Sequence, residues 1–422
     1  MGEVSDWTMR SGEASVHAQR LAGVVAPPAA SQTTRTCGEP HVAQSTPSGG
    51  SVNPAYSIVD SLRAILAGVV TFSHAWYLLI RDYRPGDGAL AGLGYFAAGF
   101  AHACVVLFFV LSGYWITRSV LKRLDTGWSW PRYLADRLVR LYLVLIPALI
   151  LGGLLDAVGY HVLETATHRA LTDTFVLKTN LGSTLSATTF LANMSFLQGV
   201  LARPFGSNGP LWSVAYEFWY YFWFPALAVT VRTRRISAFL PTLLLGAIAS
   251  PLAIGFLCWL AGSAVYFAER RAASTKRPAT RPSAVTLSWT AAGAAILLIL
   301  ARLVDFAFED VVLAAAFAVV LRVTLSARLE LPRCMIGLAR FGAQASFTLY
   351  AIHFPLIAFA AGLIIGRERL EPGILGLIWV VVVVATVVWL AHGLSTITEA
   401  RTDTVRQWVS RYLPRQTHGR DT

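Results

Sequence analysis

Charged residues are scarce in this chain of 422 residues. Asp, Glu, Lys and Arg together make up 14% of it, whereas hydrophobic residues make up 55%. Soluble domains carry about 25% charged residues. The composition therefore excludes an ordinary soluble protein and indicates a protein that crosses a membrane several times.

Cysteine is scarce as well, with 4 residues. None shows the C-x2-C spacing of a zinc site, and nothing suggests a disulfide scaffold. Three of them lie in or beside apolar segments, where cysteine is usually a small buried residue. The sequence thus gives no indication of a metal cofactor.

Acidic residues are fewer than basic ones, 23 against 35, for a net charge of +12. A nucleic-acid-binding surface needs its basic residues clustered on one face of a module. Here the arginines lie between apolar runs, a pattern typical of residues that fix membrane topology. We therefore expect a lipid bilayer, and no nucleic acid, as a partner.

Long apolar runs predict an all-α bundle of about ten transmembrane helices, since one span needs about 20 apolar residues. The segment 189–205 is also apolar, and we expect an interfacial or re-entrant helix there, within a long external connection at 161–210. The ten expected spans are 57–80, 98–120, 138–160, 211–231, 236–250, 252–269, 283–302, 308–327, 342–366 and 373–396.

Lys and Arg gather in the connections after the second, fourth, sixth and eighth spans and in the C-terminal segment. Cytoplasmic loops carry such an excess, so both termini should be cytoplasmic. Residues 1–55 are rich in Ser, Thr, Ala, Pro and Gly, which favours a disordered cytoplasmic tail. The expected domains are this tail, a transmembrane domain at 56–398 and a basic cytoplasmic tail at 399–422. The expected location is the inner (plasma) membrane.

Three ionisable residues interrupt the first apolar run: Asp60, Arg63 and His74. Eleven residues are nearly three helical turns, so Arg63 and His74 share one helix face, about 16 Å apart along the axis. A charged side chain at the centre of a span costs about 2.5 to 3.5 kcal/mol on insertion scales. Such residues usually face the bundle interior and have a function. The alternative is a structural pair of Asp60 with Arg63 near the inner interface.

The fourth span carries Ser213 and Glu217 one helical turn apart. Because this span enters from outside, we expect Glu217 at the depth of His74, where it would orient the imidazole as a general base. The alternative is a neutral glutamic acid in a structural hydrogen bond.

Two further groups lie near other spans. Ser346, Tyr350 and His353 share one helix face, and His353 either positions substrate or bonds a neighbouring helix. Arg137 and Arg140 are i, i+3 neighbours at the start of a helix. They could grip a phosphate as a pair, or they could only set topology near lipid headgroups.

These segments together resemble the acyltransferase 3 family of integral membrane acyltransferases, over about residues 57 to 400. The likeness rests on five ordered motifs. They are D-x-x-R with R-x10-H (Asp60, Arg63, His74), F-F-x-L-S-G-[FY] in "FFVLSGYWIT", R-x-x-R (Arg137, Arg140), W-S-x-x-x-E (Trp212, Ser213, Glu217) and S-[YF]-x-L-Y-x-x-H-x-P (Ser346, Tyr350, His353, Pro355).

The resemblance implies an enzyme that moves an acyl group such as acetyl from acyl-CoA, its co-substrate, to a hydroxyl of a carbohydrate or glycoside. His74 and Glu217 would be catalytic. Arg63, Arg137 and Arg140 would bind the phosphates of CoA. The residues expected to position substrate are Asp60, Ser213, Tyr350 and His353.

Two other classes of protein fit parts of the pattern. In a transporter or flippase of a glycan or lipid-linked sugar, the same polar stripes would line a pathway, but no inverted repeat is visible. A structural or sensory membrane protein has no reason to keep Arg63, His74 and Glu217 in apolar surroundings. The sequence leaves open the acceptor, the acyl length and the oligomeric state.

Overall fold

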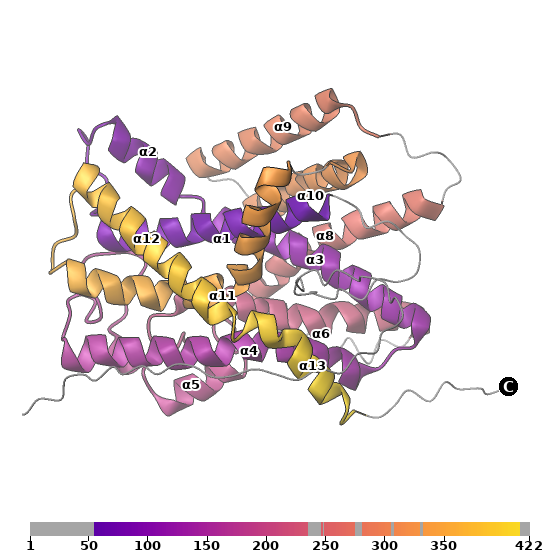
Figure 1. Cartoon of the computed structure of the whole chain (residues 1–422), viewed down its shortest axis with the longest axis horizontal. Coiled ribbons are helices and arrows are strands. Elements are labelled where there is room, and N and C mark those ends of the chain that lie inside the picture. Colours follow the sequence, from indigo (N-terminus) through magenta and orange to yellow (C-terminus); the bar gives the residue numbers. More distant parts are fainter. Residues whose placement is uncertain are drawn as a thin grey trace, which may run out of the picture. The chain divides into compact units, whose positions relative to one another are not determined.

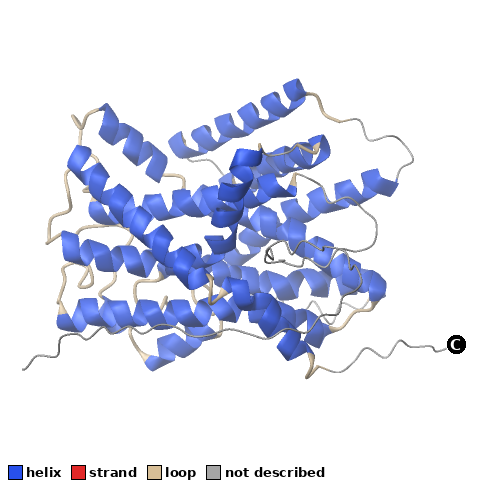
Figure 2. Cartoon of the chain, viewed as in Figure 1, coloured by secondary structure: helices blue, strands red, loops and turns tan. Residues whose placement is uncertain are grey.

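The structure is a computed structural model that describes residues 55–234, 246–247, 249–274, 281–304, 308–329 and 332–413. These residues form helices joined by loops (Figure 1), and no β-strand occurs among them (Figure 2). The expected all-α class is confirmed. The expected N-terminal tail lies, except for its last residue, outside the described residues, and so do residues 414–422.

The α-helices follow the apolar runs of the sequence. They are α1 (Tyr56–Leu79), α2 (Ala89–Ala98), α3 (Ala101–Thr126), α4 (Trp130–Ala157), α5 (Ala187–Met194), α6 (Trp212–Thr233), α8 (Ser250–Ser274), α9 (Ala284–Leu303), α10 (Glu309–Ala327), α11 (Arg333–Ile364), α12 (Ile374–Ser395) and α13 (Thr402–Ser410).

Within the described part of the chain, 8 helical segments are long and apolar enough to cross a membrane. They contain α1, α3, α4 and α8 to α12, at the positions of eight expected spans. Helix α6 occupies the expected fourth span but is not among these 8 segments. The expected fifth span, 236–250, lies almost wholly outside the described residues. A polytopic helical bundle is thus confirmed, whereas the side on which the termini lie stays a prediction.

Several helices begin away from the expected boundary. Helix α4 begins at Trp130 rather than at 138, because it continues through polar residues that hydropathy does not count, and Pro131 in its first turn favours a helix start. The expected second span, 98–120, corresponds to α3, and Gly99 separates α3 from the preceding helix α2. The side chain of Arg302 packs so closely against Gly99 that a Cβ there would clash with it.

The long connection before α6 contains the short helix α5, where the sequence predicts an interfacial or re-entrant helix. Ser186 caps this helix by accepting a hydrogen bond from the backbone N–H of Thr189 at 3.2 Å. Helix α5 has 8 residues, too few to cross a bilayer. An eleventh span is therefore absent from this described segment.

The last residues of this connection turn back into the helix bundle. Ser207 and Asn208 are both buried. The backbone N–H of Ser207 donates to Oδ2 of Asp156 on α4 at 2.7 Å, and Nδ2 of Asn208 donates to the carbonyl of Ala351 on α11 at 2.9 Å. Residues 205–211, which we call the re-entrant turn, therefore bring the start of α6 into the protein interior.

Helices α3 and α8 pack with their backbones in contact at two glycines. A Cβ on Gly113 would overlap the backbone carbonyl of Trp259, and a Cβ on Gly262 would overlap that of Val110. Close approach at small residues is the usual way in which membrane helices gain packing energy. Helices α1 and α11 form a second extensive pair.

Candidate active site

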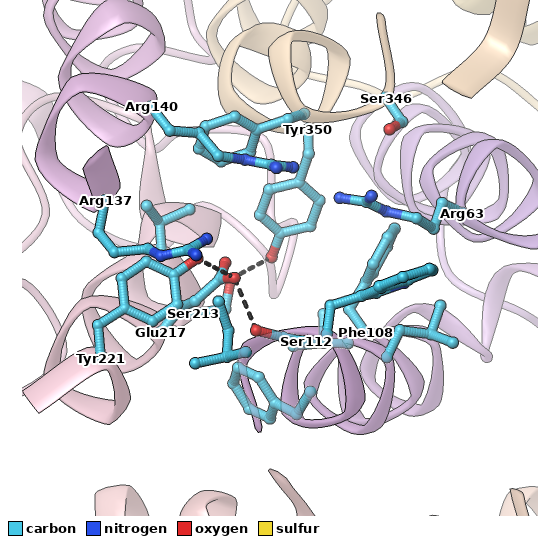
Figure 3. Close-up of a pocket in the computed structure, with 17 residues that line it drawn as sticks. Arg63, Phe108, Ser112, Arg137, Arg140, Ser213, Glu217, Tyr221, Ser346 and Tyr350 are labelled. Atoms are coloured by element: carbon cyan, nitrogen blue, oxygen red, sulfur yellow. Dashed lines mark hydrogen bonds between the residues drawn. The ribbon is translucent and has the colours of Figure 1, made fainter. Parts of the chain in front are cut away.

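A cavity of about 300 Å³ lies among α1, α3, α4, α6 and α11 (Figure 3). This volume is at the lower end of the range of small-molecule sites. The polar part of its wall consists of Arg63, Ser112, Arg137, Arg140, Ser213, Glu217, Tyr221, Ser346 and Tyr350, and Phe108 and its neighbours on α3 form an apolar part. We call it the arginine cavity.

The guanidinium groups of the three arginines reach into this cavity from opposite sides, Arg63 from α1 and Arg137 and Arg140 from α4 (Figure 3). Arg137 donates to Oγ of Ser119 at 2.7 Å and stands over the ring of Tyr221, 5.8 Å from its centroid. Its position is thus fixed by the protein.

Arg63 and Arg140 differ from Arg137, since neither guanidinium group makes a hydrogen bond or ion pair with any described residue. Carboxylates act on Arg63 only through space, and they include Asp60, Glu217 and Glu399. Both residues are half-buried, and a guanidinium group that is partly shielded from water is stabilised by an anionic acceptor. The arrangement therefore lacks an acceptor group that an anionic ligand would supply.

Glu217 belongs to the arginine cavity. Its Oε1 accepts hydrogen bonds from Oγ of Ser112 at 2.8 Å and from the hydroxyl of Tyr221 at 2.6 Å. The expectation that Glu217 orients His74 is wrong for this structure, because His74 has another partner. The physical reason is the re-entrant turn: α6 begins inside the bundle, so Glu217 lies near Arg63 instead.

Ser213 and Tyr350 join α6 to α11 at the cavity wall. Their hydroxyl oxygens lie 2.6 Å apart, and each lies 3.1 Å from the carbonyl oxygen of Pro210 in the re-entrant turn. The sequence assigned these two residues to substrate positioning on separate spans, and the structure brings them together. Ser346, also on the wall, donates to the carbonyl of Ala343 at 3.0 Å.

His74 and His353 form a second cluster beside Tyr350. Nδ1 of His74 lies 2.9 Å from Nε2 of His353, and the two rings stack with centroids 5.0 Å apart. Nδ1 of His353 lies 2.7 Å from the carbonyl oxygen of Tyr350. A carbonyl only accepts, so Nδ1 of His353 carries a proton, and Nε2 of a neutral His353 must be the acceptor from His74. Neutral His74 then bears its proton on Nδ1 and has a free lone pair on Nε2.

Asp60 does not line the arginine cavity. It lies one turn before Arg63 on α1 and acts on Arg63 and Arg140 through space. Of the expected site residues, the structure gathers Arg63, Arg137, Arg140, Ser213, Glu217 and Tyr350 around one cavity and His74 and His353 in the adjacent pair.

The sequence prediction missed the two partners of Glu217. Ser112 lies in the quoted "FFVLSG" segment, and Tyr221 follows Glu217 by four residues, which places both side chains on one face of α6. That spacing was the available signal. No group of three His, Cys, Asp or Glu side chains suited to a metal occurs among the described residues.

The fold and this site define a class of protein, a polytopic membrane protein with a cavity among its helices that is lined by arginines and hydroxyl groups. The family model described as "Acyltransferase domain" matches residues 56–393. The chain belongs to the acyltransferase 3 family and is a membrane acyltransferase. No curated protein and no solved structure gives a significant match.

Proposed function

We propose that the protein transfers an acyl group such as acetyl from acyl-CoA to a hydroxyl of a carbohydrate or glycosylated acceptor, in the inner (plasma) membrane. The observation that carries the proposal is the arginine cavity, in which Arg63 and Arg140 lack acceptors among the described residues. Phosphate oxygens of CoA supply such acceptors, and arginine binds phosphate strongly. No metal enters the proposed reaction.

The acyl group has to travel along α1 from these arginines. Arg63 and His74 are separated by about 16 Å along the helix axis. The pantetheine arm of CoA is a long flexible chain that separates the phosphates from the thioester. Phosphates held near Arg63 therefore allow the thioester to lie near His74.

His74 is the proposed general base, and its lone pair on Nε2 suits that role. The acceptor oxygen attacks the thioester carbonyl carbon while its proton passes to Nε2 of His74. The carbon–sulfur bond then breaks, and the thiolate takes up the proton, which gives the ester and free CoA. Such base catalysis contributes about 10² to 10⁴-fold. A covalent acyl-imidazole at His74 is the alternative route to the same products.

His353 takes the orienting role that we expected of Glu217. It accepts the proton on Nδ1 of His74 in a hydrogen bond, which selects the reactive tautomer. Glu217 would instead balance the charges of the arginines around the donor, with Asp60 assisting from outside the cavity. Ser213 and Tyr350 would position the part of the donor that passes between α6 and α11.

The experiment is acyl transfer by the protein in lipid nanodiscs, with radiolabelled acetyl-CoA and an extract of the host's glycans and glycosides. We expect label in a hydroxyl-bearing acceptor with the intact protein and with His161→Ala, which changes an exposed histidine just after α4. We expect no label with His74→Ala. Absence of transfer by folded intact protein, with several acyl donors, would favour a transporter or flippase instead.

A further inference from the structure

A second cavity is lined by the end of α3, the beginning of α4 and α13, which packs against α4. Its volume is about 530 Å³, and its charged wall consists of Arg123, Arg132, Asp136, Arg406 and Arg411. Four of these five side chains are cationic. We call it the outer basic pocket, because it lies farther toward the helix ends than the arginine cavity.

The one carboxylate on this wall does not neutralise the pocket. Oδ2 of Asp136 accepts a hydrogen bond from Nη2 of Arg123 at 2.5 Å, and Oδ1 of Asp136 lies 3.3 Å from Nε of Arg406. Arg406 also pairs with Asp403, which does not line the pocket, at 3.0 Å, so two carboxylates face four arginines. Arg411 makes no side-chain hydrogen bond or ion pair with the described residues. The pocket therefore keeps an excess of positive charge, which favours an anion with several negative charges.

Helix α4 connects this pocket to the arginine cavity. Arg132 and Asp136 face the pocket, whereas Arg137 and Arg140 face the cavity. From position 132 to position 140 the helix rises about 12 Å. The guanidinium groups of Arg123 and Arg137 lie on one shared ring, 5.7 and 5.5 Å from the centroid of Tyr133. An arginine of the pocket and an arginine of the cavity are therefore separated only by the ring of Tyr133.

We propose that the outer basic pocket binds the phosphorylated adenosine end of the CoA donor, including its 3′-phosphate, while the rest of the donor enters the arginine cavity. This inference rests on the proposed function, since it assumes that CoA is the donor. The cavity of about 300 Å³ is small for a ligand with a nucleotide at one end and a thioester at the other. The same phosphate chemistry could come from a lipid headgroup, so the test has to separate the two sources.

The test compares CoA with 3′-dephospho-CoA by titration calorimetry, with the protein in nanodiscs of phosphatidylcholine alone. The intact protein should bind 3′-dephospho-CoA about tenfold more weakly, the value of one hydrogen-bonded charged contact. Arg406→Gln combined with Arg411→Gln should bind both ligands equally and bind CoA about tenfold more weakly than the intact protein. The control, Arg401→Gln, changes an exposed arginine of the adjoining turn outside the pocket and should keep the intact preference.

Three outcomes would overturn the proposal. The double variant could keep the intact protein's preference for CoA, which leaves the proposed reaction standing. The double variant could bind as the intact protein does in phosphatidylcholine and differ from it only after phosphatidylglycerol is added to the nanodiscs, which assigns the pocket to a lipid headgroup. The intact protein could bind neither form of CoA, which would remove the proposed donor as well.

Discussion

Nδ1 of His74 lies 2.9 Å from Nε2 of His353, and this contact joins α1 to α11 beside the arginine cavity. His74 is the donor in this bond, because Nδ1 of His353 donates to the carbonyl of Tyr350 and leaves Nε2 of His353 as an acceptor. A neutral histidine thus orients His74 in place of a carboxylate. In an apolar bundle this avoids the cost of burying an additional charge.

The first prediction concerns His353 as a positioning residue. His353→Phe removes the acceptor for Nδ1 of His74, so we expect kcat to fall about 10²-fold, within the range that a general base contributes. KM for acyl-CoA should stay unchanged because the arginines are intact. His353→Gln offers a side-chain oxygen as acceptor and should recover part of kcat. Intact activity in the Phe variant would show that His74 needs no such partner.

The second prediction concerns Arg137. Arg137→Ala should raise KM for acyl-CoA about tenfold or more, the effect of losing one hydrogen-bonded charged contact, with a smaller change for the acceptor. Steady-state kinetics with each substrate varied in turn measures the difference. Equal losses for both substrates would argue against a phosphate-binding role. The exposed Arg367→Gln serves as the control, since it leaves the charge of the cavity unchanged.

The third prediction concerns the re-entrant turn. Gly206 has φ +60°, and a Cβ there would overlap the carboxylate of Asp156. Gly206→Ala should lower the free energy of unfolding by about 1–2 kcal/mol from the left-handed backbone alone, and further from the overlap. Activity should fall too, because the turn positions Pro210 and the start of α6. Gly209→Ala is the matched control, since nothing lies within 4 Å of its Cβ position. An equal Tm of the two variants would contradict the prediction.

The fourth prediction concerns pH and the loops beyond α1 and before α12. Hydrogen bonds from Arg81 lower the pKa of Asp87 and the pKa of Glu371 below their ordinary values of 3.8 and 4.5. Both groups therefore stabilise the folded state above those values, and the stabilisation is lost as the pH falls through the lowered pKa values. The difference in Tm between the intact protein and Arg81→Gln should be largest at about pH 6 and should shrink toward about pH 3. A difference that does not depend on pH would refute this origin.

The fifth prediction concerns topology. Reporters fused after position 275 and after position 418, both outside the described residues, should read as cytoplasmic, because each follows a cluster of Lys and Arg. A fusion within the 161–210 connection should read as external. An external signal at 418 would mean that the number of spans is odd.

Much of the fold could be predicted from the sequence, because each long apolar run has to become a helix in a membrane. For Arg63, Arg137 and Arg140 the sequence could predict only that all three bind phosphate. It could not predict that they lie close together, since the spacing of residues within one helix says nothing about the distance to another helix. The partner of Glu217 was predicted wrongly for a specific reason. Hydropathy assumes that a span begins at the membrane surface, whereas α6 begins at a turn that Asp156 and Ala351 hold inside the bundle.

The glycine contacts between α3 and α8 have a mechanical consequence. Because backbone meets backbone at these glycines, no flexible side chain lies between the two helices there, and we expect α3 and α8 to move together. Helix α3 supplies Phe108 and Ser112 to the arginine cavity, so we expect that side of the cavity to be its more rigid wall. Helices α6 and α11 meet through hydroxyl groups that can exchange partners. We therefore expect a ligand larger than the resting cavity to gain room on the side of α6, because α11 is packed extensively against α1.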